Sequence, residues 1–147
     1  TDKKLVIAGG SSDTQWYMDE LKKQAGGDER VIFTGFVDGQ LREELYSNAY
    51  LFVLPSDLEG MPLCLLEAMS FGNCVITSDI EECTNVIHDN GIIFRKSDVD
   101  DLAQKLTYAL SHPNTVRMFK WLAAEYVCTR FPWERIVEET LALYEKK

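Results

Sequence analysis

Residues 50–79 read YLFVLPSDLEGMPLCLLEAMSFGNCVITSD, and this stretch decides the fold class. The apolar run at 50–54 is ended by Pro55 and is typical of a buried strand. A helix is expected from about residue 61 to 71, and a second apolar run follows at 74–77. Strand, helix and strand in this order predict a βαβ unit, and therefore a parallel sheet.

The same alternation extends along the rest of the chain. Five strands are expected, at residues 5–8, 31–34, 50–54, 74–77 and 91–94. The first of these runs, Leu5 to Ala8, is interpreted as a strand buried on both faces. Ser11, Ser12 and Asp13 are candidate caps for the helix that follows it. The pattern predicts a Rossmann-like, three-layer α/β/α domain with a parallel sheet of about five strands.

Ligands of such sheets bind at the carboxyl ends of the strands. The loops expected there contain Gly9-Gly10, residues 35–37, residues 55–60 and Ser78-Asp79. In the 55–60 loop, Gly60 can let a ligand approach the backbone closely. The N–H groups of Met61, Leu63 and Cys64 lie at a helix start, where unpaired donors and the helix dipole suit a phosphate. This loop is therefore the first candidate for a binding site.

Composition limits the possible functions. The chain has 147 residues, a net charge of −9 and a pI near 4.7, which fits one acidic domain. An acidic surface argues against nucleic acid as a partner, because phosphate neutralisation needs a basic face. Four cysteines without a C-x-x-C pair are expected to be reduced thiols of a cytoplasmic protein. Thr1 stands where an initiator Met would, so a piece of a longer protein is expected.

The 55–69 segment, PSDLEGMPLCLLEAM, carries a more specific pattern. Seven residues stand between Glu59 and Glu67, so the two lie eight positions apart, a little over two helical turns, and both carboxylates are expected to face one side. The segment resembles the signature of the group 1, or family 4, retaining glycosyltransferases of GT-B architecture. The likeness extends to residues 31–37, 72–79 and 131–134, and so covers most of the chain.

The resemblance implies the C-terminal, nucleotide-sugar-binding domain of such an enzyme, over residues 1–147. It implies that Glu59 is catalytic, contacting the donor sugar and stabilising positive charge at its anomeric carbon. It implies that Glu67 binds the ribose hydroxyls, that backbone groups around Phe36 and Val37 contact the base, and that those of the signature loop hold the sugar and diphosphate. The predicted binding residues are Gly9, Gly10, Phe36, Val37, Gly60, Met61, Pro62, Leu63 and Glu67. A plain strand-ending turn is the alternative for Gly9 and Gly10.

The chain also departs from the family pattern. The Arg and Lys that hold the diphosphate in the family precede the part that matches this chain, and so does a strand at the centre of the sheet. Without that strand, the runs at 5–8 and 50–54 would pair directly, giving the flavodoxin-like order 2-1-3-4-5. The N-terminal acceptor domain is absent from this chain. The polypeptide alone is therefore expected to be inactive, with weakened donor binding.

Several expectations follow from the resemblance alone. The donor is a UDP-, GDP- or ADP-sugar, with no further cofactor and no metal. The full enzyme would be a hexosyltransferase of polysaccharide biosynthesis that acts on a growing or lipid-linked glycan and associates peripherally with a membrane. The isolated domain is expected to self-associate.

Two alternatives remain: a flavodoxin- or receiver-like binding module without catalysis, and a nucleotide-sugar 2-epimerase of the same fold.

Overall fold

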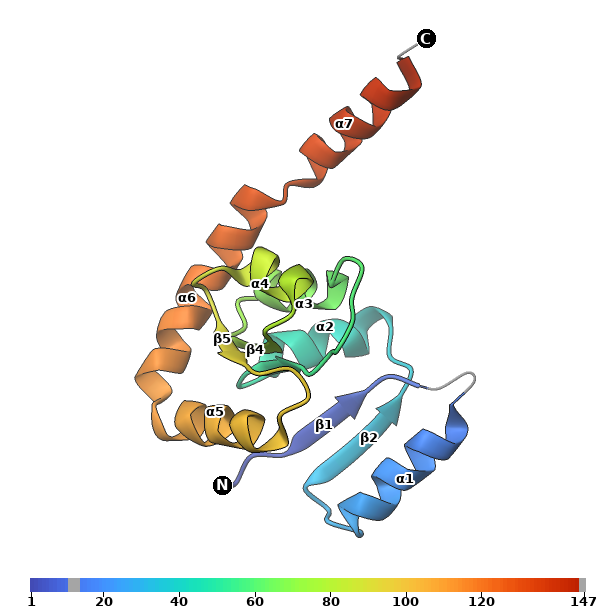
Figure 1. Ribbon diagram of the computed structural model, residues 1–147, viewed down its shortest axis with the longest axis vertical. Helices are drawn as coiled ribbons and strands as arrows, with labels where there is room; N and C mark the ends of the chain where they lie inside the picture. Colours follow the sequence, from blue (N-terminus) through green and yellow to red (C-terminus); the bar gives the residue numbers. More distant parts are fainter. Residues whose placement is uncertain (11–13, 146–147) are drawn as a thin grey trace. The chain divides into compact units, whose positions relative to one another are not determined.

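The structure is a computed structural model that describes residues 1–10 and 14–145. The chain divides into two compact units, Thr1–Leu45 and Tyr46–Lys147. Figure 1 labels the elements of both. The cap candidates Ser11, Ser12 and Asp13 lie outside the described residues.

Unit 1 is built on one pair of parallel strands. Strand β1 (Leu5–Ala8) pairs with β2 (Val31–Gly35), and helix α1 (Gln15–Ala25) forms the crossover between them. The helix ends at Gly26, which adopts the left-handed conformation at φ 60° and donates its N–H to the Lys23 carbonyl. Helix α2 (Gly39–Asn48) begins in this unit.

The prediction that β1 is buried on both faces is wrong. Leu5 and Val6 are 53% and 38% exposed. Among the described residues, β1 pairs only with β2. A strand is covered on both faces only when neighbouring strands and helices lie on each side, and a two-stranded ladder with one crossover helix cannot supply them.

Unit 2 holds the larger sheet and the main core. The three parallel strands follow the order β3 (Phe52–Leu54), β4 (Val75–Ser78) and β5 (Ile92–Phe94). The helices are α3 (Leu63–Ser70), α4 (Glu81–Ile87), α5 (Val99–Ser111), α6 (Pro113–Arg130) and α7 (Trp133–Glu145). Every residue of the central strand β4 is buried, as the apolar run at this position predicts.

The core of unit 2 lies in two clusters, because successive side chains of a strand point to opposite faces. Val75 packs with buried residues of α3, α4 and the later part of α6, including Leu65, Met69 and Val127. Its neighbour Ile76 belongs to the second cluster, which includes residues of β5, α5 and the start of α6. Helices therefore cover the sheet on both faces. The predicted Rossmann-like α/β class is confirmed.

The predicted strand order 2-1-3-4-5 is not found. The described residues form two sheets, β1-β2 and β3-β4-β5, and no ladder joins β1 to β3. Parallel strands pair only when their edges approach to about 4.8 Å.

The last helix, α7, has no buried residue. It carries apolar side chains that are 42–82% exposed: Trp133, Ile136, Val137, Leu141, Leu143 and Tyr144. Figure 1 shows this helix continuing beyond α6, away from the sheet of unit 2. Self-association through such side chains stays a prediction. None of the helices in residues 1–10 and 14–145 has the length and apolar character that a membrane crossing requires.

Candidate functional site

The loop between β3 and α3 leaves the carboxyl edge of the unit 2 sheet. Strand β3 is in parallel register with β4, with Leu54 opposite Thr77. Helix α3 begins at Leu63, later than predicted, because Pro62 stands before the first turn with ψ 75°. The Pro62 carbonyl still accepts the N–H groups of Leu65 and Leu66, at 3.0 and 3.2 Å. Residues 55–62 therefore form a loop that leads directly into the first turn of α3.

Glu59 lies in this loop and not on the helix. Its Oε1 atom accepts a hydrogen bond of 2.6 Å from the Ser56 hydroxyl. The Ser78 hydroxyl, at the end of β4, donates in turn to the Ser56 carbonyl. The helical-periodicity argument for Glu59 and Glu67 is therefore wrong at Glu59, whose position is set by loop hydrogen bonds.

Glu67 lies on α3 and is half-buried. The Tyr46 hydroxyl donates to its Oε2 atom over 3.1 Å. The Tyr46 ring is held in turn by stacking on Phe71, with ring centroids 5.5 Å apart. Sequence reasoning missed Tyr46, because a contact across 21 residues has no local spacing signal.

The two glutamates come together around Cys64. Burial is the main cause that raises the pKa of the Cys64 thiol, followed by the charge of Glu59. Glu67 adds a smaller effect in the same direction. Both carboxylates are thus close enough to act electrostatically on one sulfur atom. The structure brings Glu59 and Glu67 into one neighbourhood, although by a different route from the one that their spacing predicts.

The backbone of the loop is open around Gly60. A Cβ atom added at Gly60 would meet no atom within 4 Å. Met61 and Leu63 are 50% and 57% exposed, whereas Pro62 is buried. The Leu63 N–H donates to the Met61 carbonyl at 2.8 Å. Of the three N–H groups proposed for a phosphate, that of Leu63 is therefore used inside the loop.

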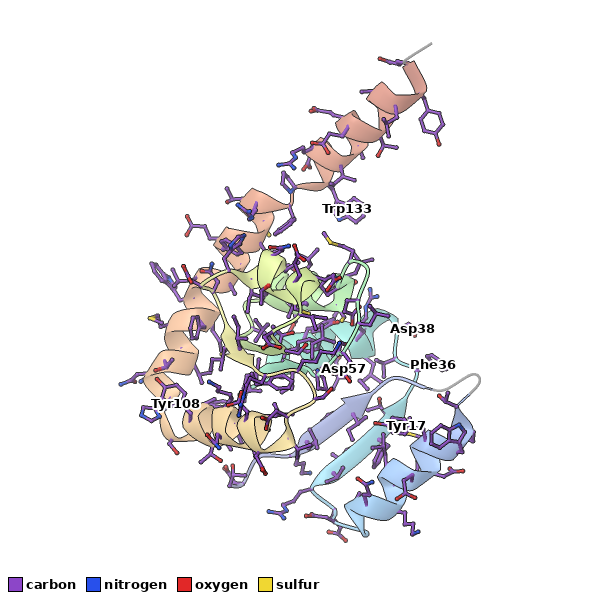
Figure 2. All side chains as sticks on the ribbon, viewed as in Figure 1. Tyr17, Phe36, Asp38, Asp57, Tyr108 and Trp133 are labelled. Atoms are coloured by element: carbon purple, nitrogen blue, oxygen red, sulfur yellow. The ribbon has the colours of Figure 1, made fainter. Side chains whose placement is uncertain are left out.

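Two further carboxylates at the same edge tie in the loop after β5. Both oxygens of Asp57, labelled in Figure 2, accept from the Ser97 hydroxyl at 2.9 Å. Asp79 accepts the backbone N–H of Lys96 at 2.8 Å. Ser97 has a left-handed backbone, with φ 58°. Carboxylates on the loops after β3 and β4 thus hold the loop after β5 in place.

In unit 1, the predicted residues gather where β1 and β2 end. The Gly9 N–H donates to the Gly35 carbonyl at 2.9 Å. A Cβ atom at Gly10 would lie 2.4 Å from ring carbons of Phe36, so any larger residue at this position would make that exposed ring shift. The Phe36 side chain, labelled in Figure 2, is 79% exposed, and Val37 is half-buried.

A shallow hollow on α5 is not a comparable site. Its lining residues are Asp100, Ala103, Gln104 and Thr107. These positions recur at helical spacing and form one outer face of a single helix. The described part of the chain also contains no group of three or more His, Cys, Asp or Glu residues suited to a metal ion.

Comparison of the sequence with known proteins assigns the chain to a family. The profile of the family "Glycosyl transferases group 1" matches residues 1–112. The chain belongs to the group 1 glycosyltransferases. An uncharacterised glycosyltransferase of Methanocaldococcus jannaschii is 33% identical over 144 residues, which is 97% of this chain and 37% of the relative. The match favours a glycosyltransferase over the binding module and the epimerase that the sequence left open.

Solved structures agree with the family. Sucrose-phosphate synthase from Thermosynechococcus elongatus superposes with a TM-score of 0.85 at 28% identity, over 97% of this chain and 38% of that chain. The Anabaena protein HepE, solved in complex with UDP and glucose, gives 0.89 at 19% identity, over 98% and 40%. The second likeness concerns the fold alone. This group 1 chain spans about two-fifths of the length of these relatives.

Proposed function

We propose that the chain is the donor-binding domain of a retaining glycosyltransferase. It would hold a nucleotide sugar whose sugar passes to an acceptor such as a growing or lipid-linked glycan. The observation that carries the proposal is the placement of the two glutamates: Glu59 is hydrogen-bonded in the loop that leaves the carboxyl edge of β3 and β4, and Glu67 lies on the helix that this loop leads into. Ligands of parallel α/β sheets bind at this edge.

The two glutamates are proposed to have different roles. Glu59 would contact hydroxyls of the donor sugar and stabilise the positive charge that develops at the anomeric carbon as the bond to the diphosphate breaks. Glu67 would accept hydrogen bonds from the ribose hydroxyls, and Tyr46 orients its carboxylate. Backbone groups of residues 60–63 would face the sugar and diphosphate.

Other parts of the proposal rest on the family resemblance. Backbone groups around Phe36 and Val37, next to Gly9 and Gly10, are proposed to contact the base of a UDP-, GDP- or ADP-sugar. The net charge of −9 disfavours a diphosphate unless cationic groups are supplied. The family's Arg and Lys would supply them, so this chain alone is proposed to bind donors weakly and to transfer no sugar. No metal is proposed for the chemistry.

Calorimetric titration with UDP, GDP, ADP and their glucose conjugates tests the proposal. One nucleotide should bind, and Glu67→Gln should weaken it by roughly tenfold or more, because a hydrogen bond to a charged group contributes about 1.5–3 kcal/mol. Glu125→Gln, which makes the same charge change at an exposed position on α6, is the matched control and should bind like the wild type. Equal binding by Glu67→Gln, or no binding by the wild type at millimolar nucleotide, would contradict the proposal.

A further inference from the structure

We infer that Ser56 and Ser78 are positioning residues that fix the carboxylate of Glu59 from the end of strand β4. The inference deepens the proposed function and rests on it, because it assigns Glu59 the contact with the donor sugar. Neither serine needs to touch the donor. Their contribution is to hold the acid in one orientation before the donor binds.

The chain of hydrogen bonds that leads to Glu59 begins on the buried central strand, β4. Ser78 is the last residue of β4 and only 1% exposed. Its hydroxyl donates to the carbonyl of Ser56, and the hydroxyl of the preceding Thr77 donates to the carbonyl of Leu54 at 3.2 Å. Two consecutive hydroxyls of the central strand therefore fix the path of the chain as it leaves β3.

The second step fixes the carboxylate itself. The 2.6 Å bond from the Ser56 hydroxyl to Glu59 Oε1 lies in the range of charge-assisted O–H···O bonds. A glutamate in a loop otherwise samples several rotamers, and freezing them opposes ligand binding. Because Ser56 already holds Oε1, Glu59 presents a fixed acceptor for the donor sugar.

The choice of a hydroxyl matters electrostatically. Within residues 1–10 and 14–145, Glu59 forms no ion pair, whereas other acids do, among them Asp28, Asp98, Asp101 and Glu139. An arginine or lysine partner would orient the carboxylate but also neutralise it. A serine orients it and leaves its negative charge to act on a positively charged transition state. The arrangement thus suits an acid that serves as an electrostatic stabiliser.

Ser97, in the loop after β5, offers a matched control. Ser97 donates its hydroxyl to both oxygens of Asp57. Ser97→Ala therefore removes a serine–carboxylate contact from the same loop without touching the bond between Ser56 and Glu59. Ser56→Thr keeps the hydroxyl and serves as the conservative variant, and circular dichroism of each variant checks folding.

The first readout needs no ligand. Three-bond NMR couplings across the Cα–Cβ and Cβ–Cγ bonds of Glu59 report whether its side chain occupies one rotamer. We expect one rotamer in the wild type, Ser56→Thr and Ser97→Ala, averaging in Ser56→Ala, and partial averaging in Ser78→Ala. Averaged couplings in the wild type, or unchanged couplings in Ser56→Ala, would overturn the inference.

The second readout compares a nucleotide with its sugar conjugate, using UDP, GDP and ADP and the glucose conjugate of each. Ser56→Ala should weaken the conjugate of the nucleotide that binds by about tenfold, which is the scale of one hydrogen bond to a charged group, and leave the free nucleotide unchanged. Equal weakening of both would indicate a merely structural role and overturn the inference. Should the wild type bind no nucleotide, the proposed function fails, while the couplings still decide whether Ser56 positions Glu59.

Discussion

The substitution Gly60→Ala separates the fold from the binding site. An added methyl group at Gly60 would meet no atom within 4 Å, and the residue does not have a left-handed backbone. Alanine at a compatible position stabilises a protein by about 0.4–1 kcal/mol, because it restricts the unfolded chain. We therefore expect the free energy of unfolding of Gly60→Ala to equal or slightly exceed that of the wild type.

Binding should respond in the opposite direction. The methyl group would occupy the open space over the loop where the sugar and diphosphate are proposed to approach. Loss of one backbone contact to a charged ligand costs about 1.5–3 kcal/mol, which is a roughly 10- to 150-fold weaker affinity. Calorimetry gives the affinity. Urea unfolding followed by circular dichroism gives the stability.

Gly72→Ala is the control, since Gly72 has φ 71° and an added Cβ atom would lie 3.4 Å from the Lys120 carbonyl oxygen. This variant should lose stability and keep its affinity. Unchanged donor affinity in a folded Gly60→Ala protein would refute the claim that the donor approaches the loop at this point.

Two further predictions concern stability and pH. Leu65→Ala should lower the free energy of unfolding by about 2–5 kcal/mol in urea titrations, since Leu65 is 0% exposed in the core beneath α3; Leu58→Ala, at an 83% exposed side chain, should change it by less than about 0.5 kcal/mol. The hydrogen bond from the Arg30 side chain lowers the pKa of Asp28 from 3.8 to about 2. The contribution of the ionised Asp28 to folding stability is therefore fully present above pH 3.8 and is lost as the pH falls through 2. An NMR titration of the Asp28 carboxyl carbon should give a midpoint near pH 2 in the wild type and one closer to 3.8 in Arg30→Ala. The same midpoint in the variant as in the wild type would contradict this prediction.

The parts of the fold with strong local signals could be predicted from the sequence. The run at 74–77 is apolar throughout, and the structure buries every residue of β4. The predicted start of α3 is too early, because proline is common in the first helical turn, whereas Pro62 stands just before that turn in the structure. Burial of β1 could not be read from its own residues, because exposure of Leu5 depends on which strands and helices surround it.

The candidate site shows the same division. The spacing of Glu59 and Glu67 within their motif identified the pair, and the structure places both near Cys64. How they reach that position depends on contacts across the fold, from Ser78 to the loop and from Tyr46 to α3. These partners are distant in sequence and lie in no shared motif, so single-sequence reasoning had no signal for them.

Backbone amide NMR spectra of the chain, recorded while the nucleotide and its glucose conjugate are added, test the central claim most directly. We expect the largest shift changes in residues 56–67, which include Glu59, Gly60 and Glu67, with saturation at a common ligand concentration. The outer face of α5, around Gln104, should not change. Shifts centred on α5 instead, or none near the signature loop at saturating ligand, would contradict the assignment of this loop as the donor site.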